Sequence, residues 1–162
     1  MLTPRGLRCA RIAKAHGMHS PYVAAIEAHR ARLPYYLAFA LMEQESGDGA
    51  NIFGHDPTIF AGAGQVTKDK YLAYKRQRGQ RLMQGVGPVQ LTWWATQDQA
   101  DRLGGCWRPK CNLRVGFSTL AALIRANGLV EGCARYNGSG PAAAAYSARL
   151  RQKAKRWKAR FG

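Results

Sequence analysis

Apolar residues recur at helical spacing in the first part of the chain, and proline or glycine stands at the ends of these stretches. Ser20 followed by Pro21 is typical of a helix start, because a capping side chain precedes proline at the first helical position. Helical periodicity then continues to residue 33, where Pro34 interrupts it. A second periodic stretch covers residues 35–46 and stops at Gly47. The pattern predicts two helices joined by a short connection.

The last third of the chain carries the same helical pattern. Residues 112–127 keep one apolar face, with Asn112 as the expected helix cap and Gly128 directly after the last turn. A short helix is predicted over residues 129–136, and Pro141 opens a final helix. The apolar face of that final helix is formed by Tyr146, Leu150, Trp157 and Phe161.

The middle third is less regular. Residues 47–64 are rich in glycine and alternate between polar and apolar positions, which predicts a loop or a short hairpin. The basic stretch 66–84 is expected to form an exposed excursion with a short helix. Glycine and proline then fix an unusual turn over residues 85–92, and Thr96 is the expected cap of the helix beyond it. The predicted fold is therefore mainly α, with irregular segments in the middle.

The length and composition fit one domain over residues 1–162, with residues 1–19 as an optional N-terminal extension. A chain of 162 residues with 46% hydrophobic content is large enough to bury a core, and we expect a monomer. No apolar run approaches the length of a transmembrane helix. The first residues also lack the continuous apolar stretch of a signal peptide, so we expect neither feature.

The cysteines and histidines are dispersed. A disulfide between Cys106 and Cys111, small buried cysteines and reduced surface thiols are all open interpretations. The spacing of Cys106 and Cys111 resembles half a zinc site, but no second pair of Cys or His stands at ligand spacing. We therefore expect no metal and no cofactor.

The charge is strongly basic. The chain has 25 Lys and Arg against 9 Asp and Glu, and a net charge of +16 implies a polyanionic partner. Nucleic acid, anionic lipid and cell wall all meet this description. A basic nucleic-acid-binding module is the alternative from a different functional class, because aromatic residues stand among the Lys and Arg. We nevertheless expect no nucleic acid, because the chain has neither helix-turn-helix nor zinc-finger spacing. The basic C-terminal helix also carries an apolar face, so contact with a membrane surface is open.

Glu45 is the first candidate for catalysis. On an ideal helix it lies beside Leu37 and Leu41, whereas Glu43 points about 160° away. A carboxyl group at the end of an apolar stripe is partly desolvated, which raises its pKa and lets it act as a general acid near neutral pH. The alternative interpretation is that Glu45 only caps the helix or pairs with an arginine.

Three separated motifs add to this interpretation. The first is Glu-Gln-Glu-Ser over residues 43–46, and the second is Gly-Val-Gly-Pro-Val-Gln-Leu-Thr over residues 85–92. The third combines Asn112, Leu113 and Gly116 with Arg-Tyr-Asn-Gly over residues 135–138. Together, in this order, they resemble the motifs of the lysozyme superfamily, especially goose-type lysozymes and soluble lytic transglycosylases. The second motif also resembles the turn of plant-type chitinases.

The resemblance implies a lysozyme-like helical domain with a loop-rich or short-hairpin insertion lining the cleft. The implied activity is hydrolysis of the β-1,4 bond between N-acetylmuramic acid and N-acetylglucosamine in peptidoglycan, with Glu45 as the acid. The expected substrate-binding residues are Ser46, Gln90, Thr92, Tyr136, Asn137 and Trp93. Trp93 is included because an indole ring can stack on a sugar ring, although packing in the core is an alternative role for it. Similarity to phage lytic enzymes further implies a phage-encoded endolysin, or a virion-associated lysin. Such an enzyme passes from the host cytoplasm to the wall, with peptidoglycan and anionic wall polymers as partners.

The second carboxylate is harder to assign. An inverting hydrolase needs a base about 6.5–9.5 Å from the acid, whereas lytic transglycosylases work without one. Asp56, in a turn before Pro57, is the expected base, although it could equally stabilise that turn, and Asp48 and Asp69 are further candidates. Some goose-type relatives carry an aspartate where this chain has Thr92. Lytic transglycosylation to anhydro-muropeptides and a chitinase-like reaction therefore stay open.

Overall fold

The computed structural model describes residues 1–55, 64–80 and 83–162. Within these residues the chain forms eight α-helices and, besides them, only isolated antiparallel β-bridges. The predicted mainly α fold is confirmed. The helices are α1 (Pro4–Ala15), α2 (Pro21–Ala31), α3 (Tyr35–Ser46), α4 (Lys68–Arg78), α5 (Trp94–Arg102), α6 (Pro109–Asn127), α7 (Leu129–Asn137) and α8 (Pro141–Phe161).

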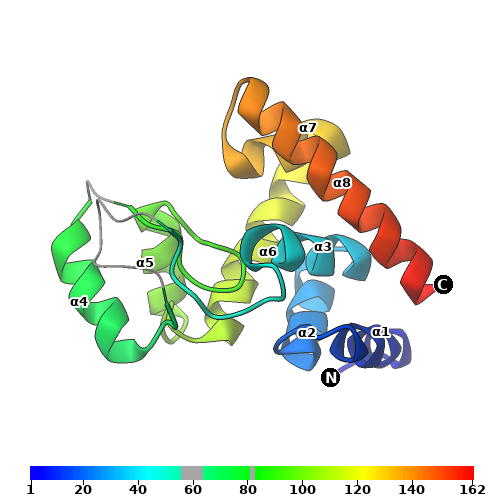
Figure 1. The fold of residues 1–162 in the computed structure, drawn as a ribbon, viewed down its shortest axis with the longest axis horizontal. Helices are drawn as coiled ribbons and strands as arrows, with labels where there is room; N and C mark the ends of the chain where they lie inside the picture. The colour runs from blue at the N-terminus through cyan, green and yellow to red at the C-terminus, as the bar shows by residue number, and fades with distance from the viewer. Residues whose placement is uncertain (56–63, 81–82) are drawn as a thin grey trace.

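The helices are arranged as two lobes (Figure 1). The described residues within 47–108 form what we call the small lobe, which contains α4 and α5. We call the group of α1, α2, α3, α7 and α8 the large lobe. Helix α6 connects the two, because it packs against α5 at one end and against α2 and α7 further along. None of the described helices combines the length and apolar character needed to cross a membrane.

The core of the large lobe lies where α8 packs along α3 and α7. The ring of Phe39 in α3 lies 5.7 Å from the rings of both Trp157 and Phe161, measured between centroids. Tyr146 and Leu150 are also buried. The predicted apolar face of the final helix is therefore confirmed.

Residues 1–19 form α1 and its connection to α2. The Thr3 side chain caps α1 by accepting a hydrogen bond from the Gly6 amide at 3.0 Å, and Pro4 occupies the first turn. Cys9 and Ala13 are buried where α1 packs against α2, α3 and α8. The segment considered as an extension therefore shares the core of the large lobe.

Several predicted helix ends are confirmed. Helix α3 ends before Gly47, whose φ is 80°, and α6 ends before Gly128, whose φ is 82°. Glycine adopts such left-handed angles at little cost, which explains why both helices stop there. Helix α8 begins at Pro141, as predicted.

Three predicted caps are wrong. Ser20 has a left-handed backbone, with φ of 48°, and its side chain makes no capping hydrogen bond. Thr96 lies inside the first turn of α5, where its hydroxyl donates to the Trp93 carbonyl. Asn112 lies inside α6, because proline at position 109 starts that helix earlier. The Asn112 side chain is consequently free to serve the turn described below.

The basic stretch 66–84 is not the exposed excursion that we predicted. Tyr71, Tyr74 and Arg78 of α4 are buried. Arg78 donates to Asp98 at 2.7 Å, and the Tyr71 hydroxyl donates to Asp101 at 2.9 Å. The buried polar groups of α4 thus have ion-pair and hydrogen-bond partners on α5, which allows this face of the helix to pack into the small lobe.

The open interpretations of the cysteines are resolved in favour of buried thiols. All four cysteines are free and buried, and Cys106 and Cys111 are not bridged. In the loop predicted over residues 47–64, Ile52 forms an isolated bridge with Gln65. No group of three or more His, Cys, Asp or Glu residues among those described could hold a metal ion.

Candidate active site

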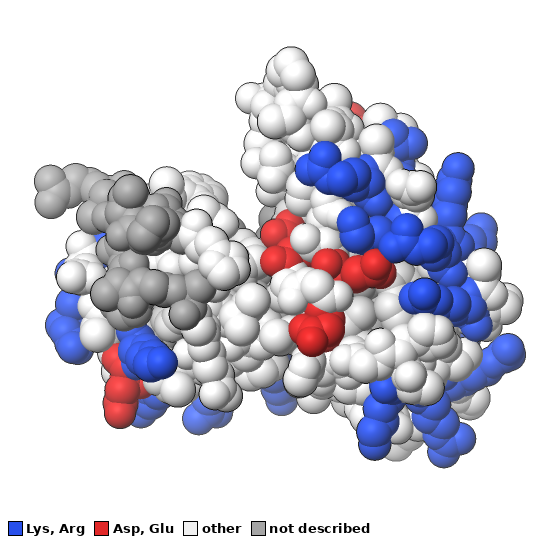
Figure 2. Space-filling view, in the orientation of Figure 1, with Lys and Arg blue, Asp and Glu red and all other residues white. Residues whose placement is uncertain are grey.

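A cleft of about 640 Å³ lies between the two lobes. Figure 2 shows a hollow between the lobes, with acidic atoms at its base. The described residues lining the cleft come from α3, the small lobe, α6 and α7, and they are Glu45, Met83, Gln90, Leu91, Thr92, Trp93, Thr96, Thr119, Leu123, Arg135, Tyr136, Asn137 and Gly138. Six of the residues predicted from the motifs are therefore brought together, although they are up to 92 positions apart in the sequence (45 to 137).

Glu45 lies in the last turn of α3 and is partly buried. The Tyr146 hydroxyl, from α8, donates a hydrogen bond to Oε1 of Glu45. Burial raises the pKa of Glu45 to about 7, and the hydrogen bond from Tyr146 acts in the opposite direction. No Lys or Arg in the described part of the chain forms an ion pair with Glu45. The carboxyl group can therefore hold its proton near neutral pH.

Glu43 lies in the same turn but has a different environment. Its carboxylate accepts hydrogen bonds from Arg156 at 2.8 Å and from the Trp157 indole at 2.7 Å. Both partners belong to α8. The two acids of this turn therefore face different surroundings, as the helical spacing predicts.

The glycine-rich turn 85–92 is held in place by α6. The Asn112 amide nitrogen donates to the Val86 carbonyl at 2.7 Å, and its oxygen accepts from the Val89 amide at 3.3 Å. Gly87 has a φ of 84°, and a Cβ there would collide with the Asn112 side chain. Asn112 therefore fixes the cleft wall and does not cap a helix.

Ser46 and Gln90 fix the same turn from the other side. The Ser46 hydroxyl donates to the Pro88 carbonyl at 2.8 Å, and Ser46 is not among the residues that line the cleft. The Gln90 amide nitrogen donates to the carbonyls of Ile52 and Gly87, both at 2.9 Å. Ser46 therefore supports the turn from outside the cleft lining. The Gln90 amide nitrogen points into the turn, although Gln90 is among the residues that line the cleft.

Tyr136 connects α7 to the turn. Its hydroxyl donates to the Val89 carbonyl at 2.9 Å. Burial and the nearby Glu45 raise the pKa of Tyr136 well above its usual value, so the phenol stays neutral. Gly116 of α6 lies beneath this contact, and a Cβ there would collide with Val89 and lie 3.1 Å from the Tyr136 hydroxyl.

The outer part of the cleft is polar and aromatic. Trp93 is 57% exposed and lines the cleft, and its ring meets Trp94 edge-on with 6.0 Å between centroids. The Thr92 hydroxyl donates to the Gln90 carbonyl at 3.1 Å. Asn137 is exposed at the end of α7. An exposed indole of this kind offers a flat apolar surface to a ligand.

The candidate bases lie in other places. Asp56 is outside the described residues, so its position is not assigned. Asp48 is exposed and lies 3.4 Å from His19, and Asp69 is in the first turn of α4. Neither lines the cleft. Glu45 is the one carboxyl group among the described residues of the cleft lining.

Sequence reasoning missed part of the site. Tyr146 was predicted only as an apolar-face residue, although its phenol is a polar group on an otherwise apolar stripe. The polar phenol group was the one feature of the sequence that could have indicated a role for Tyr146 in the site. Thr119 and Leu123 line the cleft one helical turn apart on α6, and no local signal marks them.

Comparison with known proteins gives no relative, since no protein-family model, no curated protein and no solved structure matches this chain. The chemistry of the site therefore has to be argued from its geometry. A protonated, partly buried carboxyl group at the base of a cleft with neutral donors and acceptors can protonate a leaving oxygen in a bound uncharged polymer.

Proposed function

We propose that this protein cleaves the glycan strands of peptidoglycan by hydrolysis, with Glu45 as the general acid. One observation carries the proposal. Glu45 lacks a cationic partner among the described residues, has a pKa of about 7 because it is buried, and faces a cleft of about 640 Å³. A carboxylic acid that donates a proton at neutral pH needs this kind of environment.

The first step is proton transfer. The Tyr146 hydroxyl donates a hydrogen bond to Oε1 of Glu45, and no described residue donates a hydrogen bond to Oε2. The proton carried on Oε2 passes to the glycosidic oxygen as the bond between the anomeric carbon and that oxygen breaks. Tyr146 holds the carboxyl group in orientation during this transfer.

The cleft lining suits a sugar polymer. Gln90, Thr92 and Asn137 supply uncharged hydrogen-bonding groups for hydroxyl and acetamido substituents. The exposed ring of Trp93 can stack on the apolar face of a pyranose ring. The excess of basic residues elsewhere attracts the anionic polymers of the cell wall.

Two reactions share the first step. In hydrolysis, a base activates water, and Asp56 is our candidate for that base. In lytic transglycosylation, a hydroxyl of the substrate attacks instead and leaves an anhydro sugar. The proposal includes a lysozyme-like fold and the role of a bacteriolytic phage endolysin, both of which are based on the three sequence motifs.

The test is digestion of purified peptidoglycan by the wild type, by Glu45→Gln and by Glu43→Gln, with products analysed by mass spectrometry. Glu45→Gln should lower the rate about a thousandfold, because the acid is lost while the shape is kept. Glu43→Gln makes the same chemical change on the same helical turn and should keep more than half of the activity.

The products separate the outcomes. Products with reducing ends would support hydrolysis. Anhydro-muropeptides would instead show that the reaction is lytic transglycosylation with Glu45 as the acid. If the wild type leaves the glycan intact, or if Glu45→Gln cleaves as fast as Glu43→Gln, the proposal is overturned.

A further inference from the structure

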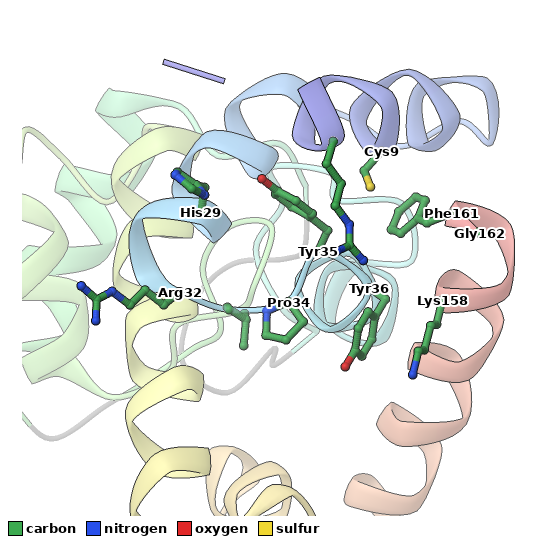
Figure 3. Close-up of a pocket in the computed structure, with 11 residues that line it drawn as sticks. Cys9, His29, Arg32, Pro34, Tyr35, Tyr36, Lys158, Phe161 and Gly162 are labelled. Atoms are coloured by element: carbon green, nitrogen blue, oxygen red, sulfur yellow. The ribbon is translucent and has the colours of Figure 1, made fainter. Parts of the chain in front are cut away.

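A second cavity, of about 520 Å³, lies at the other end of α3. It is lined by Tyr35 and Tyr36 of α3, by residues of α1 and α2, and by the end of α8 (Figure 3). Tyr35 is ten residues from Glu45, which is about 15 Å along a helix axis. Among residues 1–55, 64–80 and 83–162, none lines both this cavity and the cleft.

The inner surface of this cavity is apolar and rigid. Cys9, Leu33 and Phe161 are buried residues that contribute to its lining. The Tyr35 hydroxyl lies 3.0 Å from the Thr3 side-chain oxygen, which fixes the orientation of its ring. An apolar group of a ligand would be removed from water on this surface.

The edge of the cavity is cationic. Arg5, Arg32 and Lys158 line it together with His29, and no Asp or Glu is among the described residues of the lining. None of the three cations forms an ion pair with a residue in the described ranges, although Lys158 lies over the Tyr36 ring at 5.5 Å. An anion at this edge would therefore meet cations that have no carboxylate partner.

Arg32 ends α2 beside the cavity in the left-handed conformation, with φ of 55°, where a non-glycine residue costs about 1 kcal/mol. Glycine would fulfil the same backbone role without that cost. The Arg32 side chain points away from Tyr35, Phe161 and Lys158 (Figure 3), so it does not share an anion with Lys158.

A ligand that fits both parts must combine an anion with an apolar chain. A free phosphate would leave the apolar surface in water, and a neutral apolar molecule would leave the cations without partners. The volume is within the range of small-molecule sites. Lys and Arg also gather on the outer surface over α8 and α1 (Figure 2), where they would face neighbouring anionic headgroups.

We propose that this cavity binds one anionic phospholipid, with its phosphate held by Arg5 and Lys158 and its first acyl carbons against Leu33 and Phe161. The site is separate from the cleft and does not depend on the proposed glycan cleavage. It would hold the protein at an anionic membrane surface through a specific contact in addition to general attraction.

The test is isothermal titration calorimetry with dihexanoyl-phosphatidylglycerol below its micelle concentration. We expect saturable binding of one molecule. Dihexanoyl-phosphatidylcholine, which carries no net charge, and glycerol phosphate, which has no acyl chains, should each bind at least about tenfold more weakly. Equally tight glycerol phosphate, equally tight phosphatidylcholine or the absence of saturable binding would overturn the proposal.

A pair of matched variants separates the site from the net charge. Arg5→Gln/Lys158→Gln removes two cations from the cavity edge, whereas Arg11→Gln/Lys155→Gln removes two exposed cations of the same helices that do not line it. The first should weaken binding on the order of tenfold and the second less than twofold. Equal losses would show a diffuse attraction and overturn the proposal. Thermal unfolding checks that both variants fold.

Discussion

The two ends of α3 border cavities of similar size whose linings carry different sets of charged residues. At the Glu45 end, the charged residues of the described lining are Glu45 and Arg135, and Arg135 is paired with Glu131 at 2.9 Å. At the Tyr35 end, the described lining contains Arg5, Arg32 and Lys158 but no Asp or Glu. The net charge of +16 is therefore unevenly distributed over the molecule.

This separation has a chemical reason. A cation beside Glu45 would stabilise the carboxylate and lower its pKa, which would remove a proton donor at neutral pH. The basic residues of α8 that reach the last turn of α3 contact other side chains there. Arg156 pairs with Glu43, and Lys153 donates to Gln44 at 2.6 Å. The molecule can thus be strongly basic and still keep a neutral acid.

The largest expected effect comes from removing the support of the cleft wall. Asn112→Ala leaves the Val86 carbonyl and the Val89 amide without their buried partner, and should lower the free energy of unfolding by about 3 kcal/mol. Urea denaturation measures this loss. Glycan cleavage should fall with it, while phospholipid binding at the other end of α3 stays unchanged in the folded fraction.

Asn127→Ala is the matched control for Asn112→Ala. The Asn127 side chain donates to the Leu123 carbonyl near the end of α6 and touches no part of the turn. It should cost less than about 1 kcal/mol. Similar losses in the two variants would contradict the role of Asn112 in the turn.

The next effect concerns pH. The pKa of Glu45 is about 7 in the folded protein and has an ordinary value of 4.5, so the folded state binds the proton more tightly than the unfolded state. Stability is therefore lost as pH rises between these values. At pH 8, Glu45→Gln should be more stable than the wild type by about 3 kcal/mol, and near pH 4 the two should be equal.

The same pKa sets the activity profile. Cleavage should decline above about pH 7, because the acid loses its proton. Glu43→Gln serves as the control for the stability measurement, since it removes an ion pair with Arg156 and should give no gain at pH 8. A stability difference independent of pH would show that Glu45 is not a buried acid.

A smaller effect is expected for substrate binding. Trp93→Ala should lower kcat/KM about tenfold, mainly through KM, because the exposed ring contributes contact area and not proton transfer. The free energy of unfolding should change by less than about 0.5 kcal/mol, since the side chain is 57% exposed. Steady-state kinetics on soluble glycan fragments measures the first effect. A change confined to kcat would exclude a simple stacking role.

The smallest effect is a gain at the other end of α3. Arg32→Gly should raise the free energy of unfolding by about 1 kcal/mol, because glycine adopts the left-handed angle without strain. Phospholipid binding should change less than about twofold in the same variant, because the Arg32 side chain points away from Lys158 (Figure 3). Thermal unfolding and calorimetry measure the two. A variant that is less stable than the wild type would contradict the strain at this residue.

Local chemistry made part of this architecture predictable. Gly47, Gly128 and Pro141 mark helix ends through backbone angles that need no tertiary contact. Helical spacing also separated Glu45 from Glu43 correctly, because both positions depend on one regular helix. These properties follow from short segments, and the sequence contains them directly.

Long-range contacts account for what was missed. The hydrogen bond from Tyr146 to Glu45 joins residues 101 positions apart. The role of Asn112 depends on the turn 85–92, and the burial of α4 depends on acids of α5. A local pattern contains none of these partners, so Asn112 was assigned to a cap and α4 to the surface. The role proposed for Asp56 stays a prediction.

Gly116 has a consequence for the wall of the cleft. It lies where α6 passes beneath Val89 of the small lobe and Tyr136 of the large lobe. A methyl group added at this position would collide with Val89 and would press on the Tyr136 hydroxyl, which donates to the Val89 carbonyl. The direct contact between α7 and the turn 85–92 therefore depends on the absence of a side chain at this buried position of α6.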